Sequence, residues 1–350
     1  MKRTFLEYGE YAKLPCSLFS GIKLKIFKKI YKGDYPWLVN FLITWKCNLR
    51  CRMCNIWKKK EKTEISPEKV EKVFSERIFR KTKVVKLMGG EPTLHSKFLK
   101  IIEILSELLP NAQKVVSTNA YPYKRMKKVI NESVEIDSDI IFSLSLDGIG
   151  KTHDFIRGVN GVFSEVMKTA KYLKKIERKT KKVKLRFSFT ITPWNYKDIE
   201  KVIRLAKKME AYIGIRLAHV SKHFYGNQEK LKLFGFNKKV LIDIHKILKI
   251  HGLNTFQKKI TEAKLTKRKL PCLAFINSIA IDPQGRVKPC IYSKAIRVSS
   301  IEKFWNSERA KLIRKKIYSC KSCWSDCQTI PDLKGEYFYE KIEMLKMLLK

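Results

Sequence analysis

From residue 37 onward, short runs rich in β-branched and aromatic residues alternate with longer segments in which apolar residues recur at helical spacing. The runs that predict strands cover residues 37–44, 83–88, 113–118, 139–146, 183–192 and 213–220. Helical spacing is clearest over residues 67–79, 97–109, 163–177 and 197–209. Repeated strand–helix units predict a parallel sheet with helices outside, so we expect an α/β fold built as a partial (β/α)6 TIM-type barrel. In barrels of this type the chemistry lies at the carboxyl ends of the strands.

The pattern changes after the last of these strands. Residues 226–270 are basic and contain a predicted helix at 238–250, and we interpret them as a helical bridge. The turn sequence Asp-Pro-Gln-Gly at 282–285, between short strands at 278–281 and 286–288, predicts a β-hairpin, and a helix is expected near 306–317. The predicted parts are an N-terminal segment (1–34), a core (35–225), the bridge (226–270), a small domain with hairpin and helices (271–335) and an amphipathic helix (336–350).

The first 34 residues carry an apolar stripe with lysines largely between its members. This basic amphipathic pattern is typical of helices that lie on membrane surfaces, although the same stripe could pack against the core. The chain has no apolar run of membrane-spanning length and no secretory signal at its start. We therefore expect a cytoplasmic protein, which the N-terminal segment could hold at a membrane surface.

Composition adds a large positive charge, because 75 Lys and Arg stand against 33 Asp and Glu and give a formal net charge of +42. A thermophile surface usually raises Glu together with Lys, and the acids do not keep pace here. A field of this size attracts polyanions, so an anionic substrate or a membrane surface is expected. RNA is the weaker candidate, since no RRM or KH signature is present. A basic bias of the whole proteome is the alternative explanation.

Three cysteines, Cys47, Cys51 and Cys54, stand close together directly after the first predicted strand. Thiolates at this spacing select iron–sulfur clusters, zinc or Cu(I). Zinc normally takes four ligands, and His95 is the nearest histidine that could complete such a set. A [4Fe–4S] cluster held by three cysteines would instead keep one iron open for a small molecule.

The C-x3-C-x2-C spacing, with Asn-Leu-Arg between the first two cysteines, resembles the radical S-adenosylmethionine (SAM) superfamily. The resemblance implies that the open iron chelates the amino and carboxylate groups of SAM. The sequence Gly89-Gly90-Glu91-Pro92, after the second predicted strand, is similar to the motif of that family that holds the amino group of SAM. The family usually has an aromatic residue before the third cysteine, and here it is Met53, whose sulfur can still pack on the adenine ring.

The end of the fourth predicted strand carries a second set of matches. Ser145-x-Asp147-Gly, followed by His153-Asp-x-x-Arg157, resembles the peptide-maturase and sulfatase-maturase branch of the superfamily. That resemblance implies that Ser145 contacts the ribose of SAM and that Arg157 binds its carboxylate, to which a planar guanidinium is well suited. We interpret Asp147 and His153 as turn-stabilising residues. The SAM-binding candidates are therefore Met53, Gly89, Gly90, Glu91, Thr118, Asn119, Ser145 and Arg157.

A second cysteine group lies near the C-terminus. Cys272 and Cys290 bracket the predicted hairpin in a C-x12-G-x4-C pattern, which resembles the opening of the SPASM auxiliary-cluster domain. After it come Cys320, Cys323 and Cys327, fewer cysteines than a full SPASM domain carries. Five thiols fill one all-cysteine cubane and leave one spare, so we expect a shortened SPASM domain with one auxiliary [4Fe–4S] cluster. A zinc knuckle is the alternative.

The resemblance implies an enzyme that reductively cleaves SAM to a 5′-deoxyadenosyl radical and abstracts hydrogen from an unactivated C–H bond. Such an enzyme needs a low-potential electron donor such as ferredoxin or flavodoxin. The charge favours a membrane lipid or another anionic substrate, and modification of peptide, protein or RNA remains an alternative. An iron–sulfur electron carrier or scaffold is the alternative of another class, and it would need the cysteines but not Glu91 or Arg157.

Overall fold

The computed structural model describes residues 35–137, 139–236, 238–251, 272, 274–320 and 323. These residues include the three cysteines of the first group and four of the five C-terminal cysteines. The predictions for the N-terminal segment, for the second half of the bridge, for Cys327 and for the terminal amphipathic helix lie outside the described residues.

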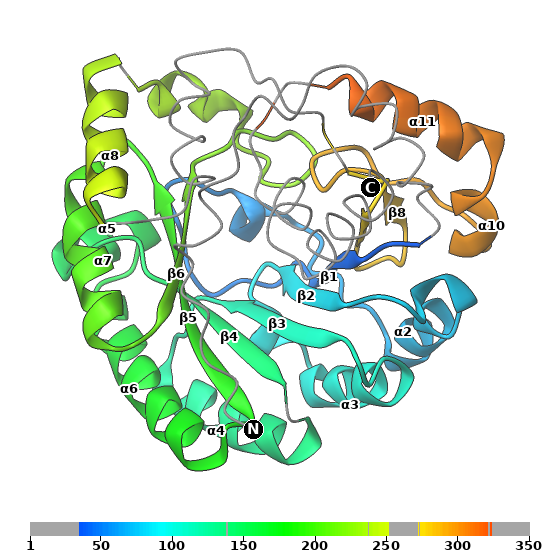
Figure 1. The fold of residues 1–350 in the computed structure, drawn as a ribbon, viewed down its shortest axis with the longest axis horizontal. Coiled ribbons are helices and arrows are strands. Elements are labelled where there is room, and N and C mark those ends of the chain that lie inside the picture. Colours follow the sequence, from blue (N-terminus) through cyan, green and yellow to red (C-terminus); the bar gives the residue numbers. More distant parts are fainter. Residues whose placement is uncertain are drawn as a thin grey trace, which may run out of the picture.

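Parallel strands form a curved sheet with helices along its outer side (Figure 1). The strands are β1 (Leu38–Thr44), β2 (Val84–Gly89), β3 (Gln113–Thr118), β4 (Ile140–Ser145), β5 (Val183–Ile191) and β6 (Tyr212–Leu217). Each pairs with its neighbours in sequence, in the order β6-β5-β4-β3-β2-β1, as short strand–helix–strand connections favour. All residues of β1 are buried, which is typical of a parallel strand covered on both faces. The predicted partial barrel of parallel strands is confirmed.

The helices cover the sheet through apolar stripes. They are α2 (Pro67–Phe74), α3 (Phe98–Leu108), α4 (Tyr123–Ile136), α5 (Lys151–Arg157), α6 (Val162–Thr180), α7 (Ile199–Lys208) and α8 (Lys238–Ile250). In α6 the buried positions include Val162, Val166, Ala170 and Leu173, a spacing that aligns them on one side of a helix. None of the described helices is both long and apolar enough to cross a membrane.

One predicted helix ends early. The helix expected over residues 67–79 stops as α2 at Phe74, and a short 3-10 helix, η4 (Arg77–Phe79), follows. Glu76 between them is extended, and its carboxylate accepts hydrogen bonds from the backbone N–H groups of Ile301 and Glu302 and from the hydroxyl of Ser300. These donors belong to the start of α10 (Ile301–Trp305). The early end therefore provides a carboxylate cap for a helix far away in sequence.

The predicted hairpin is present and joins the main sheet. It consists of β7 (Ser278–Ile281) and β8 (Val287–Lys288), which pair antiparallel. The carboxylate of Asp282 accepts the backbone N–H groups of Gln284 at 3.1 Å and Arg286 at 2.9 Å, which closes the turn. On its other side β7 pairs in parallel with β1, so the sheet continues from the barrel strands into the hairpin. The helices α10 and α11 (Glu308–Tyr318) come next along the chain.

Candidate functional site

The cysteine loop, residues 45–55, continues from β1 at the carboxyl edge of the sheet. The glycine turn after β2 holds its first part. Gly90 N donates to Thr44 O at 2.8 Å, and Glu91 N donates to Lys46 O at 2.7 Å. A Cβ on Gly90 would lie 2.0 Å from Lys46 O. The loop can lie this close to β2 because the turn has no side chain at that point.

The end of α5 holds the middle of the cysteine loop. Arg50 N donates to Arg157 O at 3.2 Å, and Arg52 N donates to Ile156 O at 2.9 Å. Gly158 lies at φ +71°, and a Cβ there would be 2.4 Å from Arg50 O. The loop is therefore fixed by backbone contacts to α5 as well as to β2.

A segment after β6 holds the last part of the cysteine loop. Asn227 Nδ2 donates to Met53 O at 2.8 Å, and Asn55 Nδ2 donates to Gly226 O at 3.0 Å. Lys230 Nζ donates to Asn55 Oδ1 at 2.8 Å. Sequence reasoning missed Asn227 and Lys230, because they bind a backbone carbonyl and an amide and belong to no recognisable motif.

Cys51 is buried, Cys47 and Cys54 are half-buried, and the three thiols lie close enough for the charge of one to affect the others. Burial, followed by the charge of Cys51, raises the pKa of both Cys47 and Cys54 to about 12. Burial also raises the pKa of Cys51, against the opposing effect of Arg157. Such a set ionises readily only when a cationic centre compensates the thiolates, and metal binding supplies that compensation. The residues fit a metal cluster in this respect.

Among the described residues, no three Cys, His, Asp or Glu side chains converge on one point as the ligands of a single metal ion do. In a cubane each cysteine binds a different iron, so its ligands need not converge. Zinc normally takes four ligands, whereas a cubane can be held by three cysteines with its fourth iron open. His95 is engaged elsewhere, because its Nε2 lies 2.8 Å from Ile65 O.

Arg157 links the cysteine loop to the end of β4. Its Nη1 lies 3.6 Å from Cys51 Sγ, and its Nη2 lies 2.5 Å from Asp147 Oδ2. Burial alone would lower the pKa of Arg157, but Asp147 and Cys51 raise it overall, so the guanidinium stays charged. Its Nε is buried and has no hydrogen-bond partner among the described residues. A buried donor of this kind is suited to an acceptor on a bound molecule.

Asp147 and His153 have the contacts of turn-stabilising residues. Asp147 is fully buried, and its Oδ1 accepts the backbone N–H of Thr190 at 2.7 Å. Asp147 N donates to His153 Nδ1 at 2.9 Å, which places the neutral ring against the turn. Asn195 Nδ2 donates to Asp147 O at 2.9 Å. The turn after β4 is thereby tied to β5 and to α5.

Glu91 lies at the centre of a buried hydrogen-bond network. Its Oε1 accepts the hydroxyls of Thr93 and Thr118, each at 2.7 Å, and its Oε2 accepts Asn119 N at 2.6 Å. Burial raises the pKa of Glu91, although these hydrogen bonds act to lower it. The carboxylate is thus engaged by protein donors and fixes the glycine turn relative to β3.

The other predicted SAM-binding residues lie along the same edge. Asn119 Nδ2 donates to Asn48 Oδ1 at 2.8 Å, and this contact joins the end of β3 to the cysteine loop. Ser145 ends β4 and is half-buried, as is Met53 within the loop. The structure therefore brings the predicted residues to one edge of the sheet, from the ends of β1 to β4.

The C-terminal cysteines are described in part. Cys272 is buried shortly before β7, and Cys290 lies just after β8, where its N–H lies 3.2 Å from Ser293 Oγ. Cys320 and Cys323 come after α11 and are half-buried.

Two family models match the chain. Residues 41–206 match the model of the radical SAM superfamily, and residues 272–328 match the iron–sulfur cluster-binding domain SPASM. The chain belongs to the radical SAM superfamily. It also carries a SPASM-type domain at its C-terminal end, as the cysteine spacing had indicated. The cofactors of a radical SAM domain are a [4Fe–4S] cluster and SAM, and a SPASM domain adds an auxiliary iron–sulfur cluster.

Curated relatives of this radical SAM protein are distant. The chain is 28% identical to the Fe-coproporphyrin III synthase of Methanosarcina barkeri over 206 residues, 58% of this chain and 47% of that protein. It is 24% identical to the antilisterial bacteriocin subtilosin biosynthesis protein AlbA of Bacillus subtilis over 298 residues, 76% of this chain and 57% of that protein. The chain spans about half the length of these curated relatives.

Solved structures agree with the fold of this radical SAM protein. The crystal structure of Streptococcus suis SuiB bound to the precursor peptide SuiA has a TM-score of 0.62 and 16% sequence identity. The match covers 85% of this chain and 70% of SuiB. At this identity the likeness demonstrates a shared fold.

Proposed function

We propose that this radical SAM protein reductively cleaves SAM and uses the resulting radical to abstract hydrogen from an unactivated C–H bond of an anionic substrate. The observation that carries the proposal is the cysteine loop, which backbone contacts from β2, α5 and the segment after β6 hold at the carboxyl edge of the sheet. When bound there, a [4Fe–4S] cluster supplies the electron that splits SAM into methionine and a 5′-deoxyadenosyl radical.

The residues of the chain then have distinct roles. Cys47, Cys51 and Cys54 would hold the cluster, and the charge of Arg157 would stabilise their thiolates. The unpartnered Nε of Arg157 is available to the carboxylate of SAM. We assign Glu91 a positioning role, because its carboxylate already accepts four hydrogen bonds from side-chain and backbone groups of the protein.

Four of the other SAM-binding candidates keep the roles that the sequence suggested. We propose that the half-buried hydroxyl of Ser145 reaches the ribose and that Met53 packs against the adenine. Gly89 and Gly90 would let the backbone approach the amino group of SAM. Thr118 and Asn119 would act through Glu91 and the loop.

The C-terminal cysteines would hold the auxiliary cluster. Cys272 and Cys290 are the firmer ligands, since they flank the hairpin that is paired with β1. Two of the three cysteines Cys320, Cys323 and Cys327 would supply the remaining thiolates. A low-potential donor such as ferredoxin or flavodoxin would provide the electron.

Two substrate classes have support. A membrane lipid is supported by the net charge of +42 and by the basic amphipathic pattern of residues 1–34. A peptide is the second candidate. It is supported by the name of AlbA, which refers to the bacteriocin subtilosin, and by the peptide SuiA bound to SuiB.

Anaerobic reconstitution with dithionite and SAM tests the chemistry, with 5′-deoxyadenosine as the product measured. The wild type should form it, and Cys51→Ala should not. Cys16→Ala is the matched control, because Cys16 belongs to neither cysteine group. A wild type that binds its clusters but forms no 5′-deoxyadenosine would instead be an iron–sulfur carrier or scaffold.

Sedimentation with anionic liposomes at low salt tests the lipid hypothesis. The full chain should sediment with the liposomes, and a chain without residues 1–34 should bind less. Absence of binding by the full chain would exclude it. Comparison of lipids and peptides from cells with and without the gene would then identify which class changes.

A further inference from the structure

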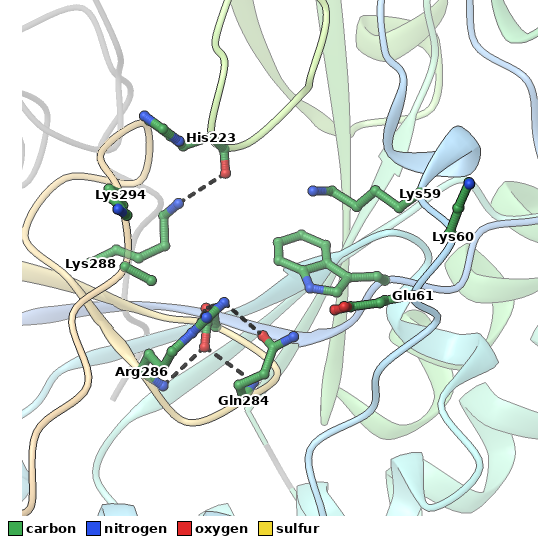
Figure 2. Close-up of a pocket in the computed structure, with 11 residues that line it drawn as sticks. Lys59, Lys60, Glu61, His223, Gln284, Arg286, Lys288 and Lys294 are labelled. Atoms are coloured by element: carbon green, nitrogen blue, oxygen red, sulfur yellow. Dashed lines mark hydrogen bonds and ion pairs between the residues drawn. The ribbon is translucent and has the colours of Figure 1, made fainter.

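A cavity of about 360 Å³ lies at the carboxyl edge of the sheet, between the cysteine loop and the β7–β8 hairpin (Figure 2). We refer to it as the lysine cavity. Its lining includes Trp45 and Lys59 from the core and Asp282, Arg286, Lys288 and Lys294 from the hairpin region. The barrel edge and the hairpin therefore both contribute walls.

The lysine cavity has more cationic than acidic side chains. Five lining residues are Lys or Arg, and two, Asp282 and Glu61, are acidic. The buried carboxylate of Asp282 is committed to Arg286, whose Nη2 lies 2.7 Å from Oδ2, and to amides of the turn. Glu61 is exposed to solvent. The two acidic residues thus offset only part of the positive charge of the five cationic side chains.

The lysines of the cavity face one another. Lys288 is only 2% exposed, and its Nζ donates to His223 O at 3.1 Å. Lys59 Nζ lies 4.7 Å from the centre of the Trp45 ring. Figure 2 shows the ammonium ends of Lys59 and Lys288 directed toward each other from opposite walls.

This arrangement is costly without an anion. Lys59, Lys288 and Lys294 form no ion pair with any residue that the structure describes. Like charges that face each other across a partly buried space repel, and burial increases the cost because water cannot screen them fully. An anion between Lys59 and Lys288 would interact favourably with both.

We propose that the lysine cavity binds a phosphoryl group of the substrate, with Lys59 and Lys288 as its main ligands. The inference rests on the proposed function, because it assigns a place to part of the anionic substrate. A phosphomonoester carries about two negative charges at neutral pH, which matches two ammonium groups better than one carboxylate does. Lysine binds phosphate as a point charge, whereas a carboxylate is matched best by the fork of arginine, and Arg286 is already paired.

The position of the cavity indicates what a bound phosphoryl group would do. Lys59 follows Cys54 by five residues, and Trp45 precedes Cys47 by two. A phosphoryl group bound here would anchor the substrate beside the cysteine loop. Binding energy from such a non-reacting group can hold the reacting carbon in position.

Titration calorimetry on the full chain with reconstituted clusters tests the proposal, without SAM or reductant. The probe is glycerol 3-phosphate, and glycerate is its carboxylate counterpart. We expect glycerol 3-phosphate to bind, and Lys59→Met/Lys288→Met to weaken its binding at least about tenfold. The matched control is Lys124→Met/Lys315→Met, which removes the same charge from exposed positions outside the cavity and should bind as the wild type does.

Three results would overturn the proposal: equal affinity in the wild type and the cavity variant, equal weakening in both double variants, or tighter binding of glycerate. Because Lys288 is buried, circular dichroism first establishes that the double variant folds. If it does not, the single variant Lys59→Met replaces it, since Lys59 is half-buried on a loop. Unchanged affinity in that variant would then overturn the proposal.

Vesicles separate the two sources of a phosphoryl group. Phosphatidic acid vesicles present it on a lipid, and phosphatidylcholine vesicles are the neutral control. Binding of glycerol 3-phosphate or of phosphatidic acid that depends on Lys59 supports the proposal, and binding of neither overturns it. These measurements need no SAM cleavage, so a failure of the phosphoryl subsite is distinguishable from a failure of the radical chemistry.

Discussion

Replacing Gly158 with alanine tests whether α5 sets the position of the cysteine loop. Gly158 has φ +71°, and an added Cβ would lie 2.4 Å from Arg50 O. Gly161 is a close match, because its φ is +80° but nothing lies within 4 Å of an added Cβ. Gly161→Ala therefore measures backbone strain, whereas Gly158→Ala measures strain together with the contact.

The expected magnitudes differ accordingly. The left-handed conformation costs a non-glycine residue about 1–2 kcal/mol, and both variants should lose that amount of stability. Ordinary contact begins at 3.4 Å, so in Gly158→Ala the Arg50 carbonyl or α5 must also move by about 1 Å. Overpacking of this kind adds about 1–3 kcal/mol, which gives a total of about 2–5 kcal/mol for Gly158→Ala.

Urea unfolding of the cluster-free protein measures the stability of both variants, and iron and sulfide content after reconstitution reports on the loop. We expect Gly158→Ala to be the less stable variant and to bind less iron than Gly161→Ala at a temperature where both are folded. Equal free energies of unfolding in the two variants, or full iron content in Gly158→Ala, would refute the reasoning.

Buried groups elsewhere lead to three more predictions. Asp147→Asn leaves the buried guanidinium of Arg157 without its counter-charge, and urea unfolding should show that the free energy of unfolding falls by about 3–5 kcal/mol. A fall of less than about 1 kcal/mol would contradict a charged pair. Asn227→Ala removes a hydrogen-bond donor to the cysteine loop, so it should lower the free energy of unfolding by about 1–3 kcal/mol and speed the loss of iron to a chelator. An unchanged rate of iron loss would mean that the loop does not depend on Asn227. Burial lowers the pKa of His95 and His153 from the ordinary 6.5, and each Nδ1 accepts a backbone N–H. As the pH falls, these histidines are protonated in the unfolded chain at a higher pH than in the folded protein. The free energy of unfolding should therefore fall as the pH drops below about 6.5. If His95→Asn kept the whole pH dependence, His95 would have no part in it.

The strands of the barrel could be predicted because burial on both faces leaves mostly apolar runs, as in β1, where only Asn40 and Thr44 are polar. The hairpin could be predicted from its turn residues, whose role Asp282 illustrates. The pairing of β7 with β1 could not be predicted, since the paired residues Leu38 and Ser278 are far apart in sequence and carry no mutual signature. The early end of α2 could not be predicted for the same reason, because the N–H groups that Glu76 caps belong to α10, far away in sequence.

In the candidate site, too, some features could be predicted from the sequence and others could not. The cysteine triplet is visible in the sequence because ligand spacing is local. The contact of Arg50 with Arg157 is a backbone hydrogen bond and leaves no trace in side-chain identity. The network around Glu91 depends on the ends of β2 and β3 lying side by side, so the sequence could identify the residue but not its partners.

The pairing of β7 with β1 also affects how the chain behaves when it is cut. Over residues 38–41, β1 is paired with β2 on one side and with β7 on the other. A chain that ended at residue 251 would lose β7 and expose the edge of the strand that leads into the cysteine loop. Open edges of this kind pair with other chains and promote aggregation. The hairpin therefore also protects the edge of the fully buried strand β1, and the radical SAM core is expected to aggregate without it.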